Sequence, residues 1–132
     1  MSAYHSLCEI VSEISLLTST EAVLSWDQET YMPSKALDFR ASQMSYLAGK
    51  AHALLTSAKT RKLLDRAETE MPETPTQAAN VRGLRRDIDR ATKLPAKLVL
   101  EESETTTHAK AAWVEARAKS DFSMFAPHLE HL

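Results

Sequence analysis

Five histidines are the residues best suited to binding a catalytic metal ion. They are His5, His52, His108, His128 and His131. A zinc site needs three or four ligands that meet in space, and only the last two histidines are close in sequence. They lie three residues apart, whereas the helical metallopeptidase motif has two histidines four residues apart, with a glutamate directly after the first. The spacing therefore predicts exposed histidines near the end of the chain and no metal ligand.

Cys8 is the single cysteine and the strongest candidate for a nucleophile. A reactive thiolate needs a nearby cation, but residues 1–34 contain no Lys or Arg. We therefore expect Cys8 to be a packed thiol. The chain has neither a glycine-rich phosphate loop nor a G-x-S-x-G turn, so no residue is assigned to catalysis.

The segment 82–93 is rich in arginine and is the candidate for binding a polyanion. Its basic residues at 82, 86, 90 and 93 share one face of a predicted helix, which suits contacts with phosphates. Asp87 and Asp89 interrupt this face, and no aromatic residue is available to stack on a base. We therefore expect no nucleic-acid binding. Instead, the spacing favours ion pairs of Arg85 and Arg86 with Asp89.

The segment 25–33, Ser-Trp-Asp-Gln-Glu-Thr-Tyr-Met-Pro, is the densest group of large and charged residues. The helix dipole disfavours a carboxylate at the C-terminal end of a helix, so Asp27 is expected to have a specific partner. The first candidate is Arg86, in a bidentate pair that would fix the angle between two helices. The alternative is that Trp26 is a core residue and that the acids pair with other basic side chains. The candidate contacts are Trp26, Asp27, Arg86 and Asp89.

The elements that carry these residues are predicted to be helices, because apolar side chains recur every three or four positions. Only two glycines occur, which disfavours the hairpins of a β-rich fold. Capping residues and prolines divide the chain near Thr18, Pro33, Ser57, 71–75, Pro95 and Ser120. The prediction is an all-α bundle of five to seven helices with short loops, forming a single helical domain over residues 1–132. The expected buried side chains include Leu7, Ile14, Leu47, Leu54, Leu84 and Trp113.

Composition and charge point to an ordinary globular protein. The apolar fraction is 43%, the charged fraction 26% and the net charge −2, which argues against disorder and against general binding of polyanions. No apolar run approaches the ~20 residues of a membrane span, and no signal peptide is recognisable. The expected location is the cytoplasm, with no membrane or nucleic-acid partner.

Four blocks of sequence, in order, resemble the Taq-type thermostable zinc metallocarboxypeptidases. The blocks are Leu24-Ser25-Trp26-Asp27-Gln28-Glu29-Thr30-Tyr31-Met32-Pro33, then Arg40-Ala41-Ser42-Gln43 with Leu47-Ala48, then Arg85-Arg86-Asp87-Ile88-Asp89-Arg90-Ala91-Thr92-Lys93-Leu94-Pro95, and finally Trp113-Val114-Glu115-Ala116-Arg117-Ala118-Lys119-Ser120-Asp121-Phe122 with Phe125-Ala126-Pro127-His128-Leu129. Together they extend over nearly the whole chain.

The resemblance implies a helical metallopeptidase that removes single residues from the C-termini of peptides. Such enzymes are much longer than this chain, and their zinc (or cobalt) is held by an H-E-x-x-H helix and a later glutamate that this sequence lacks. The matching region is an N-terminal helical part that walls and covers the active-site cleft, so Asp27 could face that cleft. The chain is expected to be such a fragment, inactive by itself, with no cofactor of its own.

The expected partners are the remainder of the peptidase or a second copy of the chain, since family members are commonly homodimers. Peptide substrate is expected only for the full-length enzyme. The alternative is a free-standing helical module for interaction or dimerisation without catalysis. Either case predicts that the chain self-associates or leaves an apolar surface open.

Overall fold

The computed structural model describes residues 2–70 and 72–132, and all regular structure in them is helical. In chain order the elements are α1 (Ala3–Thr30), η1 (Ser34–Ala36), α2 (Leu37–Thr56), α3 (Ala58–Thr69), α4 (Pro75–Ala91), α5 (Ala96–Lys119), η2 (Phe122–Met124) and α6 (Ala126–His131). The predicted all-α fold with short connections is confirmed. Within the described residues, no helix is both long and apolar enough to cross a membrane.

Helix α1 continues through Thr18, where a new helix was predicted. The Thr18 hydroxyl donates to the Ile14 carbonyl at 3.1 Å instead of capping a following helix. Ser15 and Thr20 make the same bond to carbonyls four residues earlier. Serine and threonine inside a helix can bond to their own backbone in this way. Because no proline or glycine interrupts this stretch, the predicted division near Thr18 is wrong and α1 is one long helix.

The other predicted boundaries lie close to real ones. Ser57 caps α3 by accepting a hydrogen bond from the Thr60 N–H at 3.0 Å. Thr74 caps α4 in the same way, with Pro75 in the first turn. Ser120, after α5, is the one described non-glycine residue with a positive φ, 53°. Caps and prolines thus set the boundaries that the sequence predicts.

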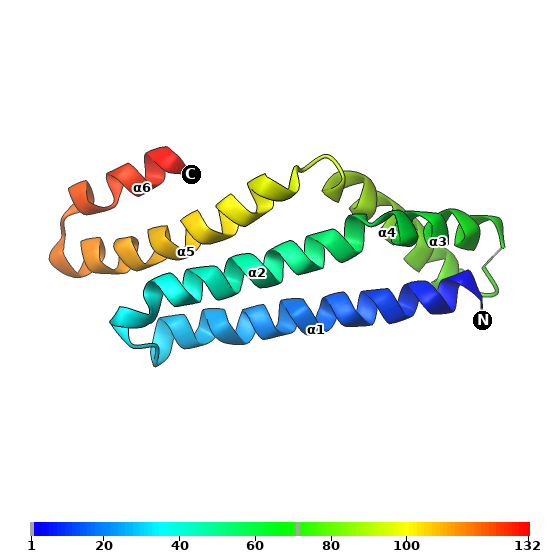
Figure 1. Cartoon of the computed structure of the whole chain (residues 1–132), viewed down its shortest axis with the longest axis horizontal. Coiled ribbons are helices and arrows are strands. Elements are labelled where there is room, and N and C mark those ends of the chain that lie inside the picture. Colours follow the sequence, from blue (N-terminus) through cyan, green and yellow to red (C-terminus); the bar gives the residue numbers. More distant parts are fainter. Residues whose placement is uncertain (1, 71) are drawn as a thin grey trace.

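Three long helices form a layer in which α2 lies between α1 and α5 (Figure 1). The α1–α2 pair is an antiparallel hairpin closed by η1. Helices α3 and α4 pack at the end where α1 begins, and η2 and α6 fold back along α5 at the other end (Figure 1). At Gly49 the helices α2 and α5 approach so closely that an added Cβ would lie 2.6 Å from Leu100 Cδ2.

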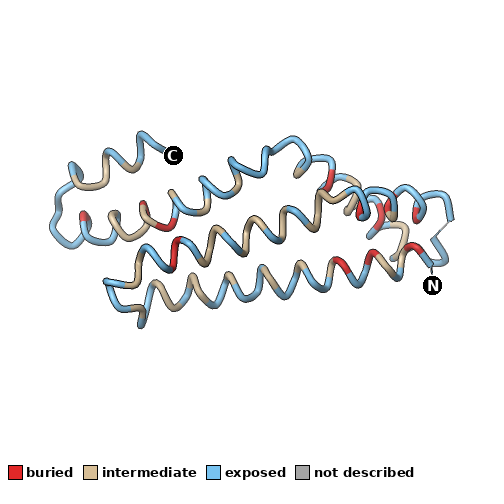
Figure 2. The backbone as a smooth tube through the Cα atoms, in the orientation of Figure 1, coloured by how far each residue is buried: buried red, intermediate tan, exposed pale blue. Residues whose placement is uncertain are grey.

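The apolar core gathers at the end of the molecule where α1 begins (Figure 2). Its buried members come from α1, α3 and α4: Ala3, Leu7, Leu64, Ala67, Val81 and Ile88. Leu7 is buried as predicted, and Leu84 packs half-buried against this cluster. Ile14, Leu47 and Leu54 are half-buried.

Trp113 is not buried, contrary to the prediction. It is 49% exposed, and the guanidinium of Arg117 lies over its ring at 5.8 Å from the centroid. On the same helix the buried residues are the smaller Thr107, Ala109 and Ala116. The helical period identifies the inward side of α5, but close packing there is made by small residues rather than by the large ring.

Candidate functional site

The segment 25–33 forms the C-terminal end of α1 and its turn into α2. Its carboxylate Asp27 pairs with Arg40, with 2.6 Å between Oδ2 and Nη2. Arg40 is 9% exposed and also donates to the Leu24 carbonyl and, at 3.1 Å, to Gln43 Oε1. The last turn of α1 contains no basic residue, so a cation from α2 neutralises both the carboxylate and the negative helix end.

The predicted pair between Asp27 and Arg86 is therefore wrong. Asp27 lies where α1 ends, whereas α4 packs where α1 begins (Figure 1). Arg86 is exposed, and its ion-pair partner among the described residues is the adjacent Asp87 at 3.7 Å. A tight hairpin brings Arg40 opposite Asp27. The two residues are 13 positions apart in sequence, and this short separation was the signal that could have identified Arg40.

Trp26 does not belong to the core. Its side chain is 57% exposed and forms an edge-to-face pair with Tyr31, with 5.6 Å between ring centroids. Asp27 thus makes a contact between helices, while Trp26 and Arg86 lie at the surface.

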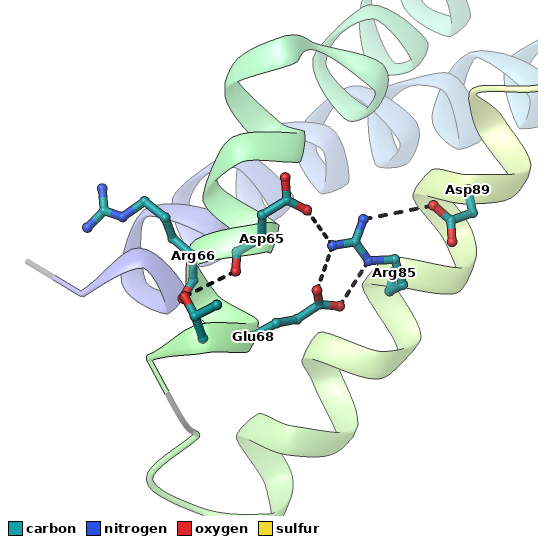
Figure 3. A network of polar contacts seen from close by, with 6 residues as sticks. Asp65, Arg66, Glu68, Arg85 and Asp89 are labelled. Atoms are coloured by element: carbon teal, nitrogen blue, oxygen red, sulfur yellow. Dashed lines mark hydrogen bonds and ion pairs between the residues drawn. The ribbon is translucent and has the colours of Figure 1, made fainter.

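Arg85, rather than Arg86, connects α4 to another helix (Figure 3). Its guanidinium lies 2.6 Å from Asp65 and 2.7 Å from Glu68, both on α3. Asp89, one turn further along α4, lies 4.0 Å away, which confirms the predicted pair of Arg85 with Asp89. Hydrogen bonds to Glu68 and Asp65 raise the pKa of Arg85, and the bond from Arg85 lowers the pKa of Glu68.

One cavity lies between α5 and α6, with a volume of about 360 Å³. It is lined by Glu101, Glu104, Thr105, His108, His128 and His131. His108 Nε2 lies 3.1 Å from Asp38 Oδ1 on α2, and Nδ1 lies 2.9 Å from the Glu104 carbonyl. Burial by itself would lower the pKa of His108, but these two acceptors outweigh it and raise the pKa.

The described residues do not form a metal centre. No three side chains of His, Cys, Asp or Glu among them lie close enough together to hold an ion. Cys8 is exposed rather than packed, contrary to the prediction. The chemistry that a metallopeptidase requires is therefore not assigned to any described residue of this chain.

A second cavity lies over α2, between α1 and α5, with a volume of about 330 Å³. One end is crossed by contacts from α1 to α5: Gln28 Nε2 donates to the Thr107 carbonyl at 3.0 Å, and Lys110 pairs with Glu29. This cavity combines charged groups with an apolar lining. It was not predicted, because its residues come from three helices and share no local pattern.

The arrangement of the helices is that of part of a helical carboxypeptidase. The solved structure BsuCP superposes with a TM-score of 0.90 and 25% identity, covering 98% of this chain and 26% of that one. The M32 carboxypeptidase from Deinococcus radiodurans R1 gives a TM-score of 0.73 and 40% identity over the same shares of the two chains.

Residues 6–132 match the family model described as Carboxypeptidase Taq (M32) metallopeptidase, and the chain belongs to this family. It is 33% identical to Thermostable carboxypeptidase 1 of Thermus thermophilus over 98% of its length. It is 27% identical to Carboxypeptidase 1 of Bacillus subtilis over 94% of its length. The chain spans only about a quarter of each relative, 26% and 25% respectively.

Proposed function

We propose that this chain serves as the N-terminal helical part of a zinc-dependent carboxypeptidase that removes single residues from the C-termini of peptides. The observation that carries the proposal is the match to the M32 family over residues 6–132. Its helices would wall and cover the active-site cleft. The zinc (or cobalt) ligands and the catalytic glutamate would come from an H-E-x-x-H helix outside these residues, so the chain by itself would be inactive.

The apolar surface supports a packing partner. Among the described residues, fourteen large apolar side chains are exposed, for example Leu16, Phe39 and Tyr46 at 70%, 70% and 62%. These side chains are available for a partner to cover. The partner would be the remainder of the peptidase, and a second copy of the chain is the competing one. The cytoplasm remains the predicted location.

The direct test is a chimera with Carboxypeptidase 1 of Bacillus subtilis, in which the region that matches this chain is replaced by residues 1–132. We expect the chimera to release C-terminal residues from a peptide in a reaction that a chelator stops. The Bacillus enzyme without that region should be inactive, because its cleft would lack one wall. The separate chain, given zinc or cobalt, should release nothing.

Two outcomes would contradict the proposal. If the well-folded chimera has no activity, the helices do not perform the same task in this chain. If the separate chain hydrolyses peptides and a chelator stops the reaction, the catalytic residues are not outside it.

A further inference from the structure

The cavity between α1, α2 and α5 is lined by apolar side chains, two glutamates and other polar groups. Met44 and Ala48 of α2 and Val99 of α5 supply the apolar surface. Glu21 enters from α1 and Glu102 from α5. The two carboxylates come from helices on either side of α2 and line the same cavity, where Glu21 is half-buried and Glu102 lies at the exposed rim.

Neither carboxylate has a cation of its own. Among residues 2–70 and 72–132, no basic side chain lies within ion-pair distance of Glu21 or Glu102. The one basic residue in the lining, Lys110, pairs with Glu29 and lies 3.4 Å from the Ser25 hydroxyl. Burial raises the pKa of Glu21, so the ionised carboxylate lacks part of its hydration and gains from a cation that enters the cavity.

Two hydroxyl oxygens of the lining are free to accept hydrogen bonds. The hydroxyls of Thr106 and Thr107 donate to carbonyls of their own helix at 2.6 and 2.8 Å, which leaves their oxygen lone pairs available. The amide of Gln28 donates to the Thr107 carbonyl. A ligand with N–H donors, a positive charge and an apolar stem suits the two unpaired carboxylates, these oxygens and the apolar side chains.

We propose that the cavity between α1, α2 and α5 binds an alkylammonium group, with its charge between Glu21 and Glu102 and its alkyl chain against Met44, Ala48 and Val99. An ammonium has three N–H donors pointing in different directions, which suits acceptors on facing walls, whereas a guanidinium holds its donors in one plane. The volume of about 330 Å³ is at the lower end of ligand sites. The site is independent of the proposed peptidase function.

The test is an NMR titration of the 132-residue chain with n-pentylamine, which is protonated at neutral pH. We expect saturable shifts of backbone amides centred on the helix faces that line the cavity. Glu21→Gln should weaken binding about tenfold, the effect of losing one charged hydrogen bond. Glu13→Gln is the matched control because Glu13 is an exposed acid on the same helix, and it should leave the dissociation constant within about twofold.

A neutral ligand and a lysine derivative complete the experiment. n-Pentanol has the same alkyl chain without the charge, so the amide shifts that it causes should not reach saturation. Nα-acetyl-lysine amide distinguishes the two sources of the group: tighter binding than pentylamine assigns the site to a lysine side chain of a polypeptide, and weaker binding assigns it to a free amine. Three outcomes would overturn the proposal. The amide shifts could grow linearly with pentylamine and spread over α1, Glu13→Gln could weaken binding as much as Glu21→Gln does, or pentanol could bind as tightly as pentylamine.

Discussion

Arg40 contacts three groups that belong to different parts of the α1–α2 hairpin. Its guanidinium bonds to the Asp27 carboxylate, the Leu24 carbonyl and the Gln43 amide oxygen. The side chain is 10% exposed and that of Asp27 33%. A buried guanidinium needs most of its donors satisfied, so this one residue fixes the end of one helix against the start of the next.

Replacing Asp27 by Asn should therefore destabilise the chain by about 1–3 kcal/mol, because it leaves the buried guanidinium without its counter-charge. Asp87→Asn is the matched control, since Asp87 is 56% exposed and its ion pair among the described residues is with the adjacent Arg86. It should change stability by less than about 0.5 kcal/mol. Urea unfolding followed by circular dichroism measures both. Equal effects of the two substitutions would show that the Asp27–Arg40 pair contributes nothing specific.

The partner of Asp27 illustrates what could be predicted at the residue scale. Its position at a helix C-terminus indicated that it needs a cation, and it has one. The identity of that cation depended on which helices are neighbours, and arginine density alone favoured the wrong helix. Local physical chemistry thus predicted the kind of partner, and the topology of the hairpin determined which residue it is.

At the scale of elements, Arg85 holds α4 on α3. It is 31% exposed and lies close to Asp65 and Glu68, with Asp89 one turn away (Figure 3). Arg85→Met should lower stability by about 1 kcal/mol, a typical value for a partly exposed ion pair within a network. Arg86→Met is the control because Arg86 is 68% exposed, and thermal unfolding should not distinguish it from the parent chain.

The contact between Arg85 and Glu68 predicts that the stability of the chain depends on pH in the acidic range. The bond from Arg85 lowers the pKa of Glu68 in the folded chain below its ordinary value of 4.5. The stabilisation is therefore fully present above the unfolded pKa of Glu68 and is lost as pH falls through the lower folded value. The difference in stability between the parent chain and Arg85→Met should shrink over that acidic range. A difference that stays constant with pH would contradict the ion-pair explanation.

Helix positions were more predictable than helix packing. Prolines and capping residues act locally, so the starts of α3 and α4 could be inferred from Ser57 and from Thr74-Pro75. The supposed break at Thr18 failed because a hydroxyl can bond back to its own helix as readily as it can cap a new one. The cavity over α2 was invisible in the sequence, because it depends on three helices lying side by side.

At the scale of the whole molecule, the two ends differ in how they are held together. The cluster of buried apolar residues lies where α1 begins and is formed by α1, α3 and α4 (Figure 2). The other end is held by the Asp27–Arg40 pair and by small buried residues of α5, while Trp26, Tyr31 and Phe122 remain 57%, 77% and 65% exposed. A partner that binds and covers these exposed aromatic side chains would stabilise the folded chain.

Hydrogen exchange should reveal this difference along the chain. Regions with few buried apolar contacts open at lower free energy than the core, so amides near Leu7, Leu64 and Ile88 should exchange last. Amides of η2 and α6 should exchange first, because no residue of either element is buried. Mass spectrometry of peptides from each region measures both rates in one experiment.

When the chain is joined to the remainder of a relative, as in the chimera, protection should rise most at the end that carries Trp26 and Phe122. Uniform protection along the separate chain would mean that its long helices unfold as one unit and that the exposed aromatic end needs no covering partner.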